Sequence, residues 1–405
     1  MPAQSETPRF PFPFPSSPYE PGPEAREIMG KCPVTKVRLP DDSTTWLATG
    51  FAETREVLVD QRYSRQLLYA PGRERRGLDE LAEGSILALD PPEHSRLRKL
   101  VAAAFTARRI QSLQPGIAAL VDDLITGMLA GPRPTDLVQA FSLPLPSKVI
   151  CLLLGVPDED TAQFHAWSTA MLGDASQDQG ERMAALAGLG GYIAELITAK
   201  RAEPADDLIS LLTDARDSEG KLSEFELIRF CVVLLIAGYE TTANVLTLSL
   251  AALWRYPEQL RRLRDDPGLI PGAVEELLRY VNLLSAGTGA LPRMTREEVC
   301  LGGVTIPAGE TVTPAVNFAN WDPAAFEDPA RLDVGRAPKS HLAFGGGVHH
   351  CLGAQLARLE LQEAFRGLLS RLPGLRMAVP ESELEYRQNN AVTSMRALPV
   401  TWDDA

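Results

Sequence analysis

The stretch His341-Leu-Ala-Phe-Gly-Gly-Gly-Val-His-His-Cys-Leu-Gly353 decides the fold of this chain. It places Cys351 in a glycine-rich loop directly before a helical pattern at residues 354–369. Free amides and the positive dipole end at a helix start favour negative charge, so this cysteine is placed to be a thiolate. Phe344 can cover the sulfur, and His349 supplies a nearby donor. Three glycines let the loop fold tightly and approach a flat partner; they are Gly345, Gly347 and Gly353.

The segment from Phe344 to Gly353 resembles the cysteine-ligand loop of the cytochrome P-450 family, F-G-x-G-x-[HR]-x-C-x-G, at every fixed position. The resemblance implies heme b, with Cys351 as the axial ligand of the iron and with Phe344 and Gly345 beside the cofactor. A thiolate ligand pushes electron density onto iron and favours O–O cleavage. The alternative is an ordinary glycine turn with a buried, inert cysteine.

The composition of the chain favours a globular protein and argues against several other classes. The chain has 405 residues, 45% of them hydrophobic and 23% charged, which is typical of a globular protein. Its net charge of -13 argues against a nucleic-acid or membrane-surface binder. The five cysteines include no C-x-x-C pair, which suits a reducing cytoplasm. We find neither a signal peptide nor an apolar run of about 18–20 residues, so we expect a soluble, cytoplasmic protein.

The pattern of elements predicts a mainly α fold with small β-sheets. Residues 1–24 are rich in proline and are expected to form an extended arm, and residues 25–405 a single domain. A hairpin is predicted at residues 36–49, and two further strands around a turn at residues 304–309 and 311–316. The resemblance implies the single-domain P-450 fold, in which a long central helix crosses over the heme.

That central helix is predicted to begin after Ser223 and to end before Pro257. Ser223 and Glu226 form a capping-box pattern. The run at 230–237 is almost wholly apolar, which predicts burial rather than a surface position. At about 1.5 Å per residue, the helix would be roughly 50 Å long and could cross a whole domain.

The sequence Ala237-Gly-Tyr-Glu-Thr-Thr242 breaks local rules inside this buried helix. Glycine costs about 1 kcal/mol against alanine there, and an unpaired buried carboxylate costs more. Thr241 can bond back to the carbonyl of Ala237 and open a groove. A packing glycine and a helix-bending threonine would explain these residues. The segment also resembles the family's oxygen-activation motif, which implies that Glu240 and Thr241 are catalytic and handle protons beside dioxygen.

Further cofactor contacts are implied by the resemblance. His94 and Arg98 share a helix face and match the family's H-x-x-x-R pattern, whose members hold the heme propionates. Arg293 and His349 are expected to do the same. A solvated polar stripe is the alternative for His94 and Arg98.

Glu276 and Arg279 form an E-x-x-R pair, which in most helical proteins is a surface ion pair of little energetic weight. In the resembled family this pair joins an arginine from a later loop. Arg336 matches that arginine, so we expect the three residues to form a structural trio that locks the cysteine side of the fold.

We therefore expect a heme-dependent monooxygenase that inserts one atom of O2 into a bulky apolar small molecule, by hydroxylation or epoxidation. A polyketide, macrolide or terpenoid secondary metabolite fits the small and aliphatic pocket candidates, which are Val233, Ile236, Ala237, Ala290 and Val392. The chain shows no nicotinamide, flavin or iron–sulfur fingerprint. Electrons from NAD(P)H would therefore arrive through an external ferredoxin and ferredoxin reductase. We expect a monomer with a basic docking patch drawn from Arg96, Lys99, Arg108, Arg109 and Arg358.

Three alternatives remain at this stage. A heme-thiolate enzyme could use peroxide directly, although the Glu240–Thr241 pair argues against it. A non-enzymatic heme protein could sense or carry a gas, but it would not need that pair. A zinc site could use His349, His350 and Cys351, but adjacent residues cannot easily supply tetrahedral geometry.

Overall fold

The structure, a computed structural model, describes residues 7–12, 19–70, 84–102, 105–172, 179–219, 222–284, 291–337, 339–387 and 392–404. Helices dominate and the sheets are small, as predicted. The helices are α1 (Pro23–Lys31), α2 (Phe51–Val59), α4 (Glu93–Ala102), α5 (Ala107–Ser112), α6 (Gln114–Ala130), α7 (Pro144–Leu154), α8 (Thr161–Leu172), α9 (Gln179–Ala202), α10 (Leu208–Glu219), α11 (Glu224–Arg255), α12 (Pro257–Asp265), α13 (Ile270–Tyr280), α14 (Val316–Ala319) and α15 (Ala354–Arg371). The strands are β1 (Val34–Arg38), β2 (Thr44–Ala48), β3 (Tyr63–Ser64), β4 (Thr135–Asp136), β5 (Arg293–Thr295), β6 (Val299–Leu301), β7 (Val304–Ile306), β8 (Thr311–Pro314), β9 (Arg376–Met377), β10 (Tyr386–Arg387), β11 (Ser394–Met395) and β12 (Pro399–Thr401).

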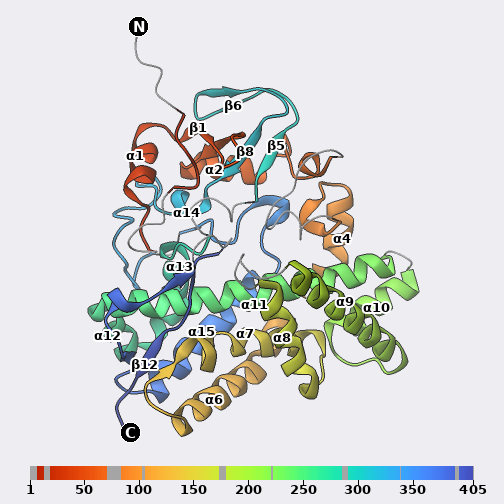
Figure 1. Cartoon of the computed structure of the whole chain (residues 1–405), viewed down its shortest axis with the longest axis vertical. Coiled ribbons are helices and arrows are strands. Elements are labelled where there is room, and N and C mark those ends of the chain that lie inside the picture. Colours follow the sequence, from red (N-terminus) through yellow and green to blue (C-terminus); the bar gives the residue numbers. More distant parts are fainter. Residues whose placement is uncertain are drawn as a thin grey trace.

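Helix α11 crosses the whole molecule, with the β-rich part on one side and α6, α7, α8 and α15 on the other (Figure 1). Its capping box is formed as predicted, because Ser223 accepts from the Glu226 amide and Glu226 accepts from the Ser223 amide. Among the described residues, α11 is the one unbroken helix long and apolar enough to cross a membrane, but 67% of its apolar window is buried inside the structure. Its place in the core accounts for its composition.

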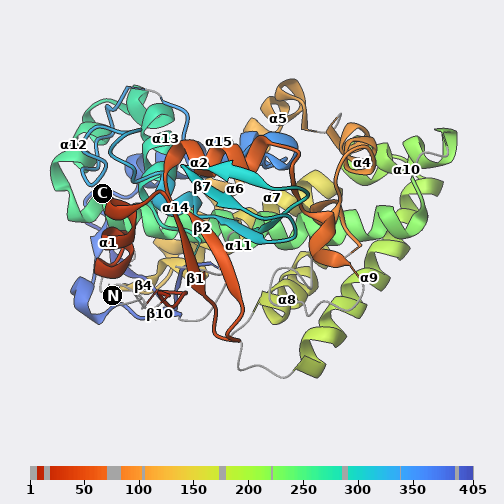
Figure 2. The same ribbon diagram turned by 90° about the horizontal axis from the view of Figure 1, so that it is seen from above.

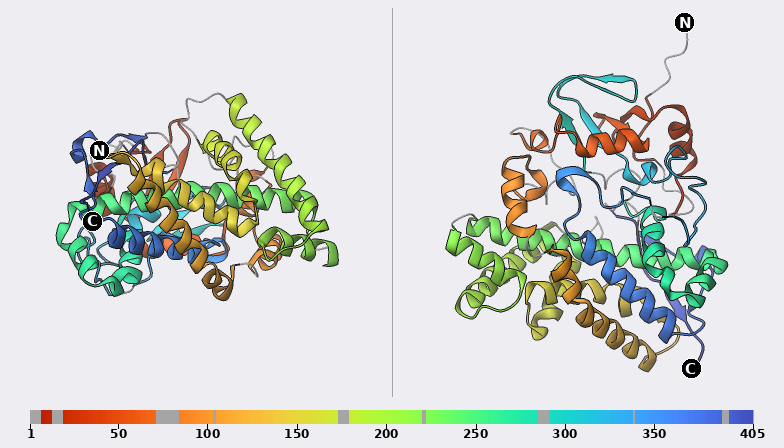
Figure 3. Two further views of the ribbon diagram at one scale, coloured as in Figure 1. Left: turned by 90° about the horizontal axis from the view of Figure 1, so that it is seen from below. Right: turned by 180° about the vertical axis from the view of Figure 1, so that it is seen from behind.

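Helices α6 and α15 pack along one another beneath α11 (Figure 3). Helices α8 to α10 form a separate group at one end of α11, away from the sheets (Figure 2). One hydrophobic cluster runs through these layers, from Tyr19 near the start of the chain to Trp402 near its end. The end of α11 that leads into α12 and the C-terminal strands therefore shares a core with the helices that flank the cysteine loop.

The largest sheet has the order β1-β2-β8-β5-β3. Strands β1 and β2 form the predicted antiparallel hairpin. The two strands predicted at residues 304–316 exist, but they do not pair with each other. Instead β7 pairs with β6, and β8 joins β2 and β5 in the large sheet. Pairing with strands distant in sequence thus decides the partners of β8, although only a short turn connects it to β7.

The N-terminal arm is packed against the domain where it is described. The Phe10 amide donates to the Arg38 carbonyl on β1 at 2.8 Å, and the Phe10 and Phe12 rings are buried. They contact Leu47 and Phe318 in a small apolar cluster. The division into an arm and a single domain stays a prediction.

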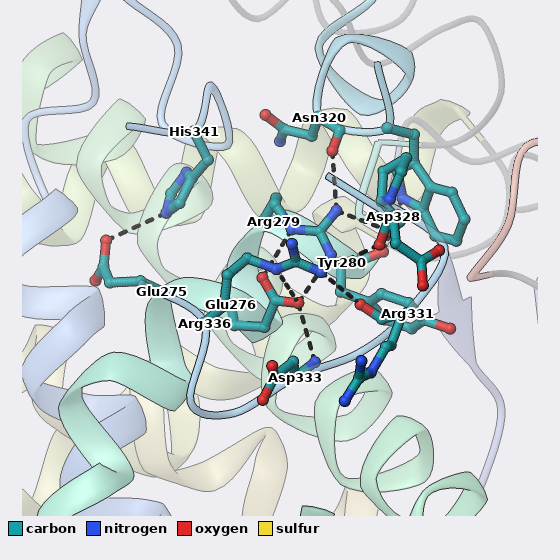
Figure 4. Close-up of polar contacts among 12 residues, drawn as sticks. Glu275, Glu276, Arg279, Tyr280, Asn320, Asp328, Arg331, Asp333, Arg336 and His341 are labelled. Atoms are coloured by element: carbon teal, nitrogen blue, oxygen red, sulfur yellow. Dashed lines mark hydrogen bonds and ion pairs between the residues drawn. The ribbon is translucent and has the colours of Figure 1, made fainter. Parts of the chain in front are cut away.

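A buried ionic cluster lies where α13 meets the segment before the cysteine loop (Figure 4). Arg279 donates to Glu276 through two nitrogens, at 2.7 and 2.9 Å, and both side chains are 2% exposed. Arg336 Nε donates to Glu276 Oε1 at 3.0 Å, and the Asp333 amide donates to the same oxygen at 3.1 Å. Arg279 Nη1 also donates to the carbonyls of Asn320 and Pro329, each at 3.0 Å. The three charged residues expected to meet are therefore in contact.

Replacing Glu276 with glutamine should lower the free energy of unfolding by about 3–5 kcal/mol, because the buried guanidinium of Arg279 and the half-buried one of Arg336 would lose their only buried counter-charge among the described residues. Urea unfolding followed by circular dichroism measures this. Glu27→Gln removes a carboxylate from an exposed pair with Lys31 and should leave the midpoint unchanged. Equal midpoints for the wild type and Glu276→Gln would contradict the structural role of the cluster.

Candidate functional site

The cysteine loop is closed by its own backbone and by contact with α2. The Cys351 amide donates to the Phe344 carbonyl at 2.9 Å. Gly347 has φ +64, and a Cβ there would lie 2.4 Å from the Leu58 carbonyl oxygen. Glycine is required at 347 because the loop packs against the end of α2, and the approach of the loop to a flat partner stays a prediction. Gly345, with φ +69, has a turn conformation that also favours glycine.

The Cys351 thiol is under opposing influences. Solvent can reach Cys351, yet protein atoms surround it closely enough that burial raises the pKa of its thiol. The Gly353 amide and the charges of Arg98 and Arg358 act in the other direction. Burial therefore opposes the helix-start amides, and the thiolate form of Cys351 stays a prediction. A bound metal cation would complete the deprotonation, since coordinating thiols are deprotonated outright.

Four of the expected cofactor-binding residues come together beside this loop. The rings of His94 and His349 lie 4.4 Å apart between centroids. Burial, with the charge of Arg98 next, lowers the pKa of His94 to about 4. Burial, followed by the charge of Arg293, lowers the pKa of His349 to about 2. Both imidazoles are neutral at pH 7, mainly because burial disfavours their charged form and also because nearby guanidinium groups repel a further positive charge.

This cluster fits the two carboxylates of heme. His94 Nδ1 and His349 Nε2 are buried without a hydrogen-bond partner, which is costly unless a ligand supplies one. Arg98 holds the loop by donating to the His350 carbonyl at 2.6 Å, and Arg293 is 2% exposed. A ligand with two anionic oxygens would satisfy the imidazoles and offset the guanidinium charges.

Arg65 is a member of this cluster that sequence reasoning missed. It is fully buried and its charge acts on His349. It donates to the Leu87 and Pro292 carbonyls at 3.0 and 2.8 Å, and to the Tyr69 hydroxyl at 2.5 Å. No motif marks it, because it is brought to the cluster by β3, whose partner β5 begins at Arg293.

One contact expected from the sequence is formed in the middle of α11, which is regular α-helix throughout this segment. Thr241 Oγ1 donates to the Ala237 carbonyl at 2.6 Å. A Cβ added at Gly238 would meet only Ile150 Cδ1 at 3.5 Å, an ordinary contact, so packing does not demand glycine there. Burial raises the pKa of Glu240 to about 7, against the opposing effects of Arg387 and Asn244. The carboxyl is therefore poised to exchange a proton near neutral pH.

The pocket candidates are placed in part. Ile236 is buried, Val233 is half-buried and Ala237 is exposed on α11. Val392 forms a β-bridge with Leu284. Ala290 lies outside the described residues.

The zinc alternative gains no support. In the parts of the chain that the structure describes, no group of three or more histidine, cysteine, aspartate or glutamate side chains could hold a metal ion. Cys351 is also one of five free cysteines. A single thiol next to an anion-binding cluster suits a cofactor that brings its own metal.

Comparison with known proteins agrees with this chemistry. The model of the family "Cytochrome P450" matches residues 175–267 and 269–388. The chain is 46% identical over 379 residues to mycinamicin IV hydroxylase/epoxidase of Micromonospora griseorubida, covering 93% of this chain and 94% of that protein. It is also 46% identical to nocardicin C N-oxygenase of Nocardia uniformis, covering 91% and 92%.

Solved structures give the same result. A mutant of the mixed-function P450 MycG in complex with mycinamicin V has a TM-score of 0.91 and 43% identity, covering 98% of this chain and 100% of the other. CYP105P1 in complex with filipin I has a TM-score of 0.90 and 40% identity, covering 99% and 100%. The whole chain thus shares its fold with solved P450 structures, and it belongs to the cytochrome P450 family of heme-dependent monooxygenases.

Proposed function

We propose that this P450 inserts one oxygen atom into a bulky apolar secondary metabolite of polyketide, macrolide or terpenoid type, by hydroxylation or epoxidation. The observation that supports its chemistry best is the pair of buried, unpartnered imidazole nitrogens of His94 and His349 beside the Cys351 loop. The names of its relatives support the substrate class. They include the mycinamicin IV hydroxylase/epoxidase and a pentalenic acid synthase of Streptomyces avermitilis, the latter 41% identical to this chain.

Each part of the site has a role in this proposal. Cys351 would bind the iron of heme through its thiolate, and Phe344 and Gly345 would shape the loop around the sulfur. His94, Arg98, Arg293 and His349 would hold the heme propionates. Bound heme supplies the redox chemistry that activates dioxygen. The trio of Glu276, Arg279 and Arg336 keeps the loop in place and takes no part in the chemistry.

Glu240 and Thr241 handle the protons. The Glu240 carboxyl can be protonated or ionised near pH 7, so it can give a proton and regain one. Thr241 Oγ1 donates a hydrogen bond to the Ala237 carbonyl. Its lone pairs therefore remain available to accept a hydrogen bond from a donor beside α11. The two residues are consecutive on α11, so their side chains point in different directions and a bound water or substrate oxygen would have to carry a proton between them.

The substrate would lie against the apolar face of α11 at Val233, Ile236 and Ala237, with Val392 from the C-terminal region and Ala290 as further lining. All five side chains are small or aliphatic. They offer a ligand apolar contact without hydrogen bonds, which suits a large apolar ring system.

Electrons would come from NAD(P)H through a ferredoxin and its reductase, in a cytoplasmic and monomeric protein. The docking patch is smaller than the sequence suggests, because three of its five candidates are already paired. Arg96 pairs with Glu93 and Glu226, Arg109 with Asp206, and Arg358 with Glu275. Lys99 on α4 and Arg108 on α5 are exposed, and neither has an ion pair within the described part of the chain.

An optical titration of the ferric holoenzyme tests the substrate class. Macrolide lactones or terpenoids should shift the Soret band to shorter wavelength as they displace water from the iron, with low micromolar affinity. Fatty acids and small aromatics serve as the comparison set. A shift given only by those two classes would contradict the proposal, and a chain that takes up no heme would remove the role of Cys351.

Glu240→Gln should lower the rate of product formation about a hundredfold or more, since glutamine cannot deliver a proton. In the wild type the rate should fall as the pH rises above about 7, because the ionised carboxyl no longer donates. This limb of the pH profile should vanish in the variant. Glu224→Gln changes an exposed carboxylate at the start of the same helix and should keep the limb. An unchanged profile in Glu240→Gln would exclude Glu240 as the donor.

Lys99→Glu combined with Arg108→Glu should slow reduction by an acidic ferredoxin several-fold at low salt, and the difference should shrink at high salt. Stopped-flow reduction measures both. Arg26→Glu reverses an exposed charge on α1, which lies on the opposite side of the molecule from α4, and should have no effect (Figure 1). Equal rates for all three proteins would place the docking surface elsewhere.

A further inference from the structure

Two adjacent glutamates on α13 point to different partners. Glu276 belongs to the buried trio, whereas Glu275 turns toward His341 (Figure 4). Arg358 Nε and Nη2 donate to the two oxygens of Glu275 at 2.7 and 2.9 Å, which is a bidentate pair. Glu275 thus joins α13 to α15, the helix that follows the cysteine loop.

His341 adds a third contact to the Glu275 carboxylate. Its Nε2 lies 3.2 Å from Glu275 Oε2. The Ala343 amide donates to His341 Nδ1 at 3.2 Å, so the ring proton is on Nε2 and is donated to the carboxylate. Burial opposes ionisation of Glu275, but the bonds from His341 and Arg358 outweigh it and lower the pKa of Glu275 to about 2. The Glu275–Arg358 pair is therefore charged on both sides and neutral as a whole.

The pair also reaches the loop of the iron ligand. The Arg358 guanidinium carbon lies 4.5 Å from the centre of the Phe344 ring, within the range of a cation–π contact. The Phe344 carbonyl in turn accepts from the Cys351 amide. A continuous set of contacts therefore runs from Glu275 through Arg358 and Phe344 to the sulfur-bearing residue.

We propose that Glu275 is a positioning residue which, through Arg358, fixes the Phe344 ring within the cysteine loop and thereby sets the reduction potential of the iron. The proposal rests on the role of Cys351 as iron ligand. Charge, hydrogen bonding and burial around a thiolate ligand tune the potential of its metal. Here the Arg358 cation lies over the Phe344 ring, and its counter-charge, Glu275, is bound at the Nε and Nη2 edge of the guanidinium. Arg358 is thereby assigned to tuning rather than to ferredoxin docking.

Redox titration of the holoenzyme, followed optically, tests this inference. Arg358→Gln should move the midpoint potential to a more negative value, because it leaves the Glu275 carboxylate without its cation near the iron ligand. Adding Glu275→Gln should bring the potential back toward the wild-type value, since the combined variant replaces one neutral pair by another. Arg108→Gln is the matched control, and it should raise the KM for ferredoxin without moving the potential.

A wild-type potential in Arg358→Gln, with only the KM for ferredoxin raised, would overturn the inference and return Arg358 to the docking patch. If Arg358→Gln does not load heme, Arg358→Lys keeps the charge but loses the planar fork, and it should give a smaller shift of the same sign. An unchanged potential there would also overturn the inference. A wild-type protein whose ferrous–CO spectrum lacks the thiolate signature would instead refute the role of Cys351.

Discussion

The buried contact between Glu276 and Arg279 holds together the parts of this P450 that carry the iron ligand. Arg279 donates to the Asn320 carbonyl, and the side chain of Asn320 accepts from the Leu342 amide at 2.7 Å, at the start of the cysteine loop. Arg336 connects the same carboxylate to the carbonyls of Glu327, Asp328 and Arg331. One carboxylate therefore fixes two guanidinium groups, and these fix a segment that has little regular structure of its own. The cost of burying these charges is offset because each nitrogen of the two guanidinium groups has at least one acceptor.

At the cofactor side of the site, in contrast to the Glu276 cluster, positive charges are not balanced by carboxylates. Around His94 and His349 the guanidinium groups outnumber nearby carboxylates, and burial keeps both imidazoles neutral. The Asp90 carboxylate, the nearest acid to His94, is occupied by Ser64, the Arg65 amide and Arg296. The site thus has more buried positive than negative charge, and a ligand with two negative charges would balance it. The rest of the core must offset the unfavourable free energy of this arrangement when no ligand is bound.

Much of this could be predicted from the sequence, because the signals are local. The cysteine loop, the His94–Arg98 face and the capped helix around Glu240 each lie within a few residues, so spacing alone indicates them. What could not be predicted depends on tertiary pairing. Arg65 reaches the cluster through the pairing of β3 with β5, and β8 leaves its neighbour β7 for a different sheet. The burial that opposes the helix-start amides at Cys351 was also beyond the sequence, since it depends on tertiary packing around the loop.

Strand β1 is the last strand of the five-stranded sheet, and residues of the N-terminal arm lie along it. Edge strands with free amides and carbonyls are sites of intermolecular pairing. By bonding to Arg38 and covering Leu47 with Phe10 and Phe12, the arm takes the place that a second molecule could occupy. A segment that looks dispensable by its proline-rich composition therefore shields the edge of the sheet from pairing with another chain, through residues 7–12.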